Sequence, residues 1–206
     1  TGLVKIGDGT TAWTSLQYLS QKMNEWATAQ DSTAVDTVPR FCATSTSTVA
    51  AGQLRVAAFT ATRTFTVSNI SAYVSTAATD GSGTVYRRMA LYTISGTTIT
   101  LVARTDNTPT LFTGTGAQTG ALSATGGYPT TYTLNAGSRY AVGLYCANST
   151  GTISSPTFVV TNLGAGSIGS ATSVINGAVS LTSTADLPTT NQTLSATTIM
   201  PFFRLT

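Results

Sequence analysis

The sequence contains no histidine and few charged residues. Without an imidazole, neither a Ser-His-Asp or Cys-His catalytic centre nor a histidine-ligated metal site can be built. Only 8% of the 206 residues are charged, whereas soluble domains average about 25%. Helical bundles and coiled-coil rods need far more Glu, Lys, Leu and Ala. These absences exclude histidine-based chemistry and a mainly helical protein.

Cysteine is equally scarce, and long hydrophobic runs are absent. The two cysteines, Cys42 and Cys146, have neither the spacing of zinc ligands nor that of a CxxC redox pair. They form either one long-loop disulfide or two buried thiols. No signal-peptide pattern occurs at the N-terminus, which favours the thiols. Because no run of about 18 apolar residues occurs, we expect no membrane insertion.

Hydroxyl-bearing residues are abundant instead, with 44 Thr and 21 Ser. Residues 1–36 contain two Lys against four acids, a net charge of −2, together with both tryptophans. Residues 37–206 contain eight Arg against three Asp, a net charge of +5. This change in composition predicts a domain boundary near Asp36–Pro39, where the proline would end a helix.

The segment before this boundary is predicted to be helical. Thr14 and Gln17 fit the two ends of a capping box, which predicts a helix start. The large apolar residues that follow are three, four and three positions apart, as in the a/d seam of a coiled coil. They are Leu16, Leu19, Met23 and Trp26. Either this is an amphipathic helix packed on its own domain or it is a self-associating neck. Residues 14–36 are assigned to this helical unit and residues 1–13 to a preceding β unit.

After Pro39 the hydrophobic pattern changes to a period of two, which is typical of strands. Residues 65–67 and 70–74 alternate, with a bulge or break at Ser68-Asn69. Residues 84–94 and 98–104 form a predicted hairpin around Ser95-Gly96. The further strands are predicted near 40–44, 53–60, 130–134, 139–147, 156–161, 173–181 and 196–205. Short strands with Gly, Thr and Ser turns predict a mainly β fold, a β-sandwich or jelly roll, over residues 37–206.

Residues 106–129 form a long stretch rich in Gly and Thr. Because loops of this length are uncommon in compact domains, it contains either a weak strand, at 117–123, or a functional loop.

Two parts of the chain resemble bacteriophage proteins. Gly7-Asp8-Gly9, Trp13 and Leu16 follow the spacing of a segment that recurs in phage tail-fibre and baseplate proteins, where it precedes the distal part of the fibre. In the β region, the order of 88–92, 101–103 and 134–144, with the turn Ala136-Gly137 before Tyr140, resembles jelly-roll domains that end phage fibres and tail spikes. These fibres are homotrimers, so the resemblance implies that residues 14–36 form a trimeric coiled-coil neck below a jelly-roll head.

The candidate site residues lie in or next to the 106–129 stretch. Aromatic rings bind the apolar face of a sugar, and fixed polar groups select its hydroxyls. We expect contact with a host cell-surface glycan through Tyr128 and Phe112 as stacking groups and Asp106, Asn107 and Arg104 as hydrogen-bond partners. The alternative is that this stretch lies at the seam between subunits.

Catalysis, metal binding and nucleic-acid binding are not expected. Asp80, Asp106 and Asp186 are turn-type residues rather than the paired carboxyls of a glycosidase or Ca²⁺ ligands. The arginines accompany no nucleic-acid-binding motif. No phosphate-binding Gly loop is present, so no cofactor is expected.

The sequence therefore predicts a virion structural protein: a homotrimeric tail fibre or receptor-binding protein that joins other tail or capsid proteins through its N-terminal side. It would be assembled in the cytoplasm of the host bacterium. A capsid-decorating head fibre without receptor recognition is the alternative, and a polysaccharide depolymerase is less favoured.

Overall fold

The computed structural model describes residues 33–39, 42–80, 82–150, 153–162, 176–181 and 185–206. Residues 14–32 of the predicted helical neck, with Leu16, Leu19, Met23 and Trp26, lie outside the described residues, as does the segment 7–16. Within them, the protein is mainly β, as predicted from the alternating pattern. All strand pairings are antiparallel in the part of the chain that the structure describes.

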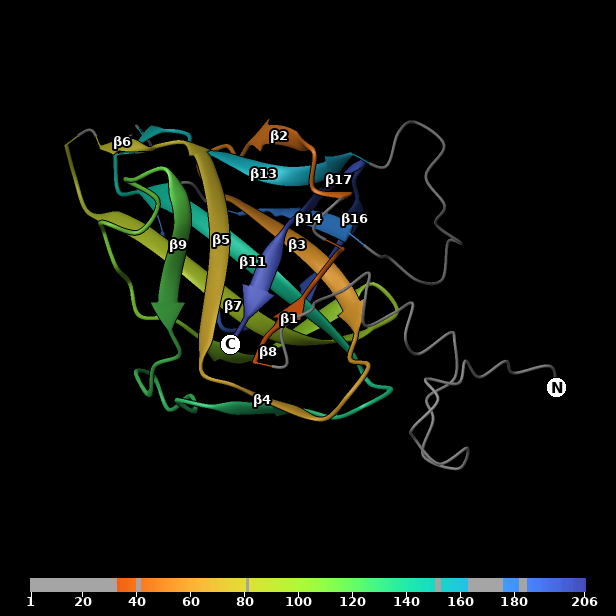
Figure 1. Ribbon diagram of the computed structural model, residues 1–206. Coiled ribbons are helices and arrows are strands. Elements are labelled where there is room, and N and C mark those ends of the chain that lie inside the picture. Colours follow the sequence, from red (N-terminus) through yellow and green to blue (C-terminus); the bar gives the residue numbers. More distant parts are fainter. Residues whose placement is uncertain (1–32, 40–41, 81, 151–152, 163–175, 182–184) are drawn as a thin grey trace, which may run out of the picture.

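Two large sheets pack face to face (Figure 1). The first sheet contains β1 (Val35–Asp36), β18 (Phe203–Leu205), β5 (Asn69–Thr76), β13 (Thr157–Asn162), β17 (Ile199–Pro201), β2 (Ser45–Thr48) and β9 (Gly116–Ala121). The second sheet has the order β15 (Gln192–Thr193), β8 (Thr98–Arg104), β7 (Val85–Ser95), β11 (Arg139–Asn148), β3 (Gln53–Thr60), β14 (Asn176–Ser180) and β16 (Ser195–Ala196).

Two small ribbons complete the described fold. They are β10 (Tyr132–Leu134) with β4 (Phe65–Val67), and β12 (Ile153–Ser154) with β6 (Thr79–Asp80). The β4–β10 ribbon lies at the bottom of the view in Figure 1. The predicted break falls at Ser68, where the chain leaves this ribbon and enters β5 of the first sheet.

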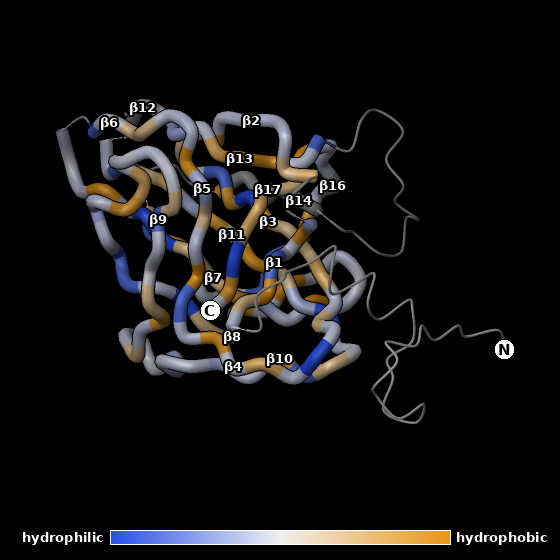
Figure 2. The backbone as a smooth tube through the Cα atoms, viewed as in Figure 1, coloured by the Kyte–Doolittle hydropathy of each residue, from blue (hydrophilic) through white to orange (hydrophobic). Residues whose placement is uncertain are grey.

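The main core lies between the two sheets. Ile70 and Phe158 of the first sheet face Leu91 and Val142 of the second, and all four side chains are buried in one cluster. Figure 2 shows hydrophobic residues along the strands that cross the middle of the molecule. Cys146 lies in this core as a free thiol, and burial raises its pKa to about 12. Cys42 is also free but only half-buried, so two thiols are confirmed in place of a disulfide, whereas the predicted burial holds for Cys146 alone.

The second sheet is buried on its outer face too. Strand β7 places Met89 and Leu91 in the main core, whereas Ala90 and Tyr92 point to a second hydrophobic cluster, as the alternation predicted. Leu187 and Leu194, from the chain that follows β14, cover this outer face. A sheet buried on both faces provides a rigid base for the residues at its edge.

Two boundaries differ from the sequence prediction. Val35 and Asp36 were assigned to the helical neck, but they form β1 and pair with Leu205 and Arg204 of β18. A strand was predicted near 40–44, but β2 begins only at Ser45. In contrast, the weak strand expected at 117–123 is present as β9, which pairs along β5.

Candidate functional site

Arg104 and Tyr128 meet at the edge of the second sheet. In the β7–β8 hairpin Arg104 is paired with Ala90, after a register shift between Leu91 and Tyr92. Ala90 and Tyr92 belong to the outer face of the sheet, so Arg104 lies on that face as well. Its guanidinium carbon is 5.0 Å from the centre of the Tyr128 ring, which is the geometry of a cation–π interaction.

A two-glycine turn brings Tyr128 over Arg104. Gly126 and Gly127 have φ angles of 81° and 83°, a conformation that glycine adopts without steric cost. The N–H of Gly127 donates to the carbonyl of Ala124 at 3.0 Å and closes the turn. A Cβ on Gly126 would lie 2.9 Å from Nη2 of Arg104. The glycine is therefore required for the close approach of the turn to the guanidinium.

Two carboxylates lie near Arg104, and each has other partners. Hydrogen bonds from the side chains of Thr125 and Ser123 lower the pKa of Asp106, and the charges of Arg88 and Arg104 add to this effect. Asp106 is exposed. It is thus an ionised, outward-facing carboxylate held by its own loop.

Asp186 is held by Arg88. The Nε and Nη2 atoms of Arg88 donate to the two carboxylate oxygens at 2.7 and 2.8 Å, and the N–H of Leu187 adds a third hydrogen bond at 2.7 Å. Burial alone would raise the pKa of Asp186, but these hydrogen bonds and the charges of Arg88 and Arg104 together lower it. This bidentate pair fastens the covering chain to the outer face.

Arg104 has no such partner. The residue is 8% exposed. Among the described residues its guanidinium forms no ion pair, and its buried Nε has no hydrogen-bond acceptor. The buried hydroxyl of Tyr92 is also without a partner there. Burial raises the pKa of Tyr92, with the charges of Tyr128 and Arg104 acting in opposite directions. We call Tyr92, Arg104 and Tyr128 the Arg104 cluster.

The structure unites three of the five predicted site residues. Arg104 and Tyr128 are in contact, and Asp106 is close enough to Arg104 for its pKa to respond. Asn107 is structural instead, because its side chain accepts from the N–H of Arg87 at 2.8 Å and donates to the carbonyl of Val85 at 2.9 Å.

The prediction that Phe112 stacks on a sugar is wrong. Its side chain is fully buried and packs edge-on against Phe158 of β13, with ring centres 4.9 Å apart. Its φ of 71° is the left-handed conformation, which turns the ring inward from a loop whose composition suggested exposure. The carbonyl of Phe112 accepts from the N–H of Ala78 at 2.9 Å. Phe112 closes one end of the core.

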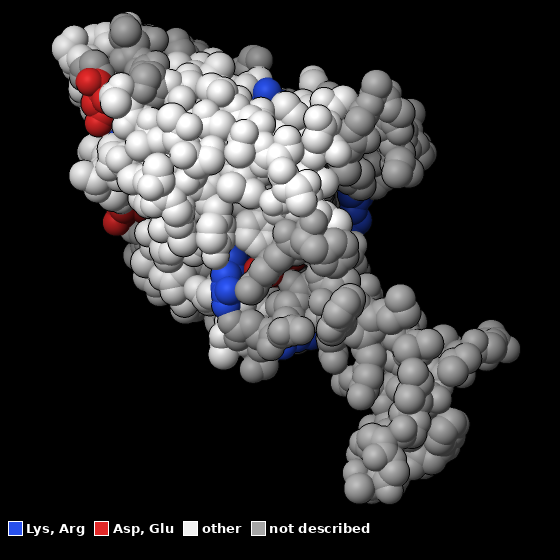
Figure 3. Space-filling view, turned by 45° about the horizontal axis from the view of Figure 1, so that its top comes forward, with Lys and Arg blue, Asp and Glu red and all other residues white. Residues whose placement is uncertain are grey.

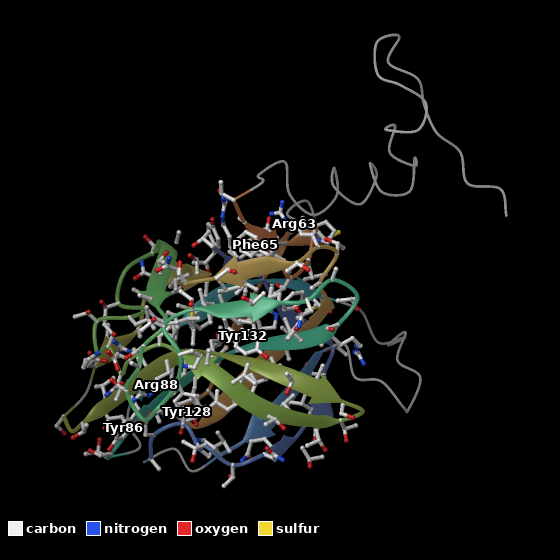
Figure 4. All side chains as sticks on the ribbon, turned by 90° about the horizontal axis from the view of Figure 1, so that it is seen from below. Arg63, Phe65, Tyr86, Arg88, Tyr128 and Tyr132 are labelled. Atoms are coloured by element: carbon white, nitrogen blue, oxygen red, sulfur yellow. The ribbon has the colours of Figure 1, made fainter. Side chains whose placement is uncertain are left out.

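Sequence reasoning missed Tyr92, Arg88 and Asp186 as neighbours of the site. The alternation of β7 already placed Tyr86, Arg88 and Tyr92 on one face, and this was the available signal. Figure 4 shows Tyr86, Arg88 and Tyr128 close together, whereas Arg63 and Phe65 lie together on another part of the molecule. Asp186 comes from a remote segment, and no local pattern points to its contact with Arg88.

Asp80 also has a structural role. Its carboxylate pairs with the fully buried Arg87, which in addition donates to the carbonyl of Pro109. In the described ranges, no group of three or more Cys, Asp or Glu residues is arranged to hold a metal ion. No helix there is long and apolar enough to cross a membrane.

No protein-family model matches the chain, and no curated protein is significantly similar to it.

Proposed function

We propose that this chain is a bacteriophage virion protein, a tail fibre or receptor-binding protein that attaches the particle to the bacterial surface. The observation that carries this proposal is the Gly7-Asp8-Gly9…Trp13…Leu16 segment, which resembles phage fibre proteins, followed by a β domain. In this proposal, residues 1–13 end an upstream fibre unit, 14–36 form the neck, and the sandwich is a jelly-roll head. The N-terminal side joins other virion proteins.

A homotrimer is part of the proposal. Leu16, Leu19 and Met23 have the spacing of a neck seam. A broad region of the face shown in Figure 3 has no charged side chains. Strands of the first sheet carry small, neutral, exposed side chains such as Thr48, Ser75 and Thr119. Neutral surfaces of this kind allow copies of the head to lie side by side without desolvating charges.

Attachment would use the exposed turn at 123–128. The turn stands on a sheet that is buried on both faces, so recognition residues can vary without disturbing the core. Tyr128 is half-buried, which leaves part of its ring free to contact a sugar. A single shallow site binds weakly, and three copies on one particle would raise the apparent affinity by about 10²–10⁴.

The test is adsorption of the labelled full-length protein to a panel of bacterial strains, in competition with phage adsorption. Tyr128→Ala is expected to reduce adsorption without changing the assembled mass. The matched control is Tyr132→Ala, because Tyr132 is also half-buried but packs edge-on against Tyr140 in the β4–β10 ribbon.

Four outcomes would contradict parts of the proposal. Unchanged adsorption of Tyr128→Ala rejects the attachment site, and dissociation of this variant places the segment at a subunit seam. Binding to capsids but not to cells would show a head fibre. Release of reducing sugars from host envelopes would show a depolymerase.

A further inference from the structure

The hydrogen bonding of the Arg104 guanidinium is incomplete, although the charges around it balance. Arg88 and Arg104 bring two positive charges to this edge of the sheet, and Asp186 and Asp106 bring two negative ones. Both oxygens of Asp186 are bound by Arg88, and Asp106 is held by Ser123 and Thr125 at the surface. Neither carboxylate forms an ion pair with Arg104 in the described part of the chain. The buried Nε–H of Arg104 thus has no acceptor among the described residues.

Two further groups indicate which kind of ligand would bind to the Arg104 guanidinium. The hydroxyl of Tyr92 is buried, has no described partner, and is close enough to Arg104 and Tyr128 to sense their charges. It can donate one hydrogen bond beside the guanidinium fork. Tyr128 covers the guanidinium with one face of its ring and remains partly exposed. These groups together match a planar anion attached to a ring with an apolar face.

The turn over the cluster presents two glycines to the solvent. Gly126 and Gly127 are both exposed and carry no side chain. A Cβ built on Gly127 would have no described atom within 4 Å. A ligand that lies along Gly127, beside Tyr128, would therefore meet no side chain of these two residues.

We propose that the Arg104 cluster binds the carboxylate of an acidic sugar, with Arg104 and Tyr92 holding the carboxylate and Tyr128 contacting the ring. Guanidinium groups bind carboxylates through two parallel hydrogen bonds, which gives the site its preference for an acid over a neutral sugar. This inference rests on the proposed attachment function and names its ligand class. An ordered water between Tyr92 and Arg104 is the competing explanation, and it predicts no selectivity for an acid.

The test is nuclear magnetic resonance of the full-length protein labelled with ¹⁵N in arginine. The probes are sodium D-glucuronate, D-glucose and sodium acetate, which separate the carboxylate from the ring. Glucuronate is expected to shift the Nε–H signal of Arg104, and glucose is expected to leave it unchanged. Acetate should bind more weakly than glucuronate because it has no ring to contact Tyr128.

Variants identify the residues involved. Arg104→Met keeps an unbranched side chain but removes the guanidinium, and it is expected to weaken glucuronate binding by roughly tenfold or more. The matched control is Arg63→Met, because Arg63 lies 5.0 Å from the Phe65 ring but donates to the carbonyl of Ala34. Tyr92→Phe should weaken glucuronate binding while leaving the thermal unfolding temperature unchanged or higher, since it removes a hydroxyl that has no partner in the described chain.

Three results would overturn the inference: no shift with glucuronate in the folded protein, equal shifts with glucose, or equal shifts with acetate. Adsorption of the same preparations to bacteria separates this failure from failure of the proposed function. If adsorption depends on Tyr128 but glucuronate does not bind, attachment stands and the acidic-sugar ligand is wrong.

Discussion

The buried arginines of this protein are compensated in three different ways. Arg87 has a carboxylate and a carbonyl, and Arg88 has the bidentate pair with Asp186. Within the part of the chain that the structure describes, Arg104 has only the ring of Tyr128. Guanidinium groups stay charged at all ordinary pH values, so burial must be offset by partners. The difference among these three residues is what distinguishes a structural arginine from one that is available to a ligand.

The pair between Arg88 and Asp186 makes stability depend on pH. Because the pKa of Asp186 is lowered in the folded protein, the unfolded chain binds the proton more tightly. The stabilisation is therefore present above the ordinary pKa of 3.8 and is lost as the pH falls through the lower, folded value. Asp186→Asn should cost about 1–3 kcal/mol near neutral pH, because Arg88 loses its charged partner.

Urea unfolding near neutral pH and in strong acid checks this prediction. The difference in the free energy of unfolding between wild type and Asp186→Asn should shrink in acid, where the wild-type carboxyl is protonated. Asp106→Asn is the control, since Asp106 is exposed and should change stability much less. A difference that is independent of pH would show that the charge of Asp186 is unimportant.

At the scale of elements, glycine positions decide how closely strands and turns approach. Gly143 lies in the middle of β11, where it pairs with Ala90 of β7 and Val56 of β3. A Cβ there would lie 2.8 Å from Cδ1 of Leu54, 3.3 Å from the carbonyl oxygen of Arg55, and 3.3 Å from the Tyr92 ring. The missing side chain makes the space that Tyr92 occupies on the outer face.

Gly143→Ala should therefore destabilise the protein by about 1–3 kcal/mol through overpacking. Leu54 can rotate, but the carbonyl of Arg55 belongs to the sheet and cannot move away cheaply. Gly114→Ala is the matched control, because its Cβ would meet only the flexible side chain of Gln118. Chemical denaturation measures the stability of both variants. Equal denaturation midpoints for Gly143→Ala and Gly114→Ala would contradict the packing argument.

For the whole molecule, the prediction concerns assembly. Light scattering of the full-length chain at micromolar concentration should give three times the mass of 21.1 kDa. Burying a Leu side chain contributes about 1.5–3 kcal/mol per chain, so Leu19→Asp should dissociate the trimer. Thr48→Asp, on the neutral face of the first sheet, tests whether the heads also contribute. A monomeric wild-type protein would contradict the proposed neck.

Much of the sandwich follows from local pattern. The alternation in 85–95 and 139–148 places residues on the correct faces, and the turns at Gly96 and Gly137 have the positive φ that their sequence predicts. The break at Ser68 and the weak strand at 116–121 were also recognisable. These features depend on the side-chain period of two and on turn chemistry, both of which act over a few residues.

The Arg104 cluster was recognisable only in part from the sequence. Arg104 and Tyr128 were expected together because they flank one stretch, but the same stretch contains Phe112, which is buried, and Asn107, which holds the backbone. Composition describes the loop as a whole. It does not say which of its residues turn inward, because that depends on whether a remote strand such as β13 offers a partner like Phe158.

The sequence by itself determined the β class, the faces of the long strands and the exclusion of histidine-based chemistry, because each depends on residue type and short-range period. Only the tertiary structure decided that β1 closes against β18, that the chain around Leu187 covers the second sheet, and that Asp186 neutralises Arg88 but not Arg104. The physical reason is that these contacts join segments far apart in the chain, and their partners are selected by packing and charge balance in the folded molecule.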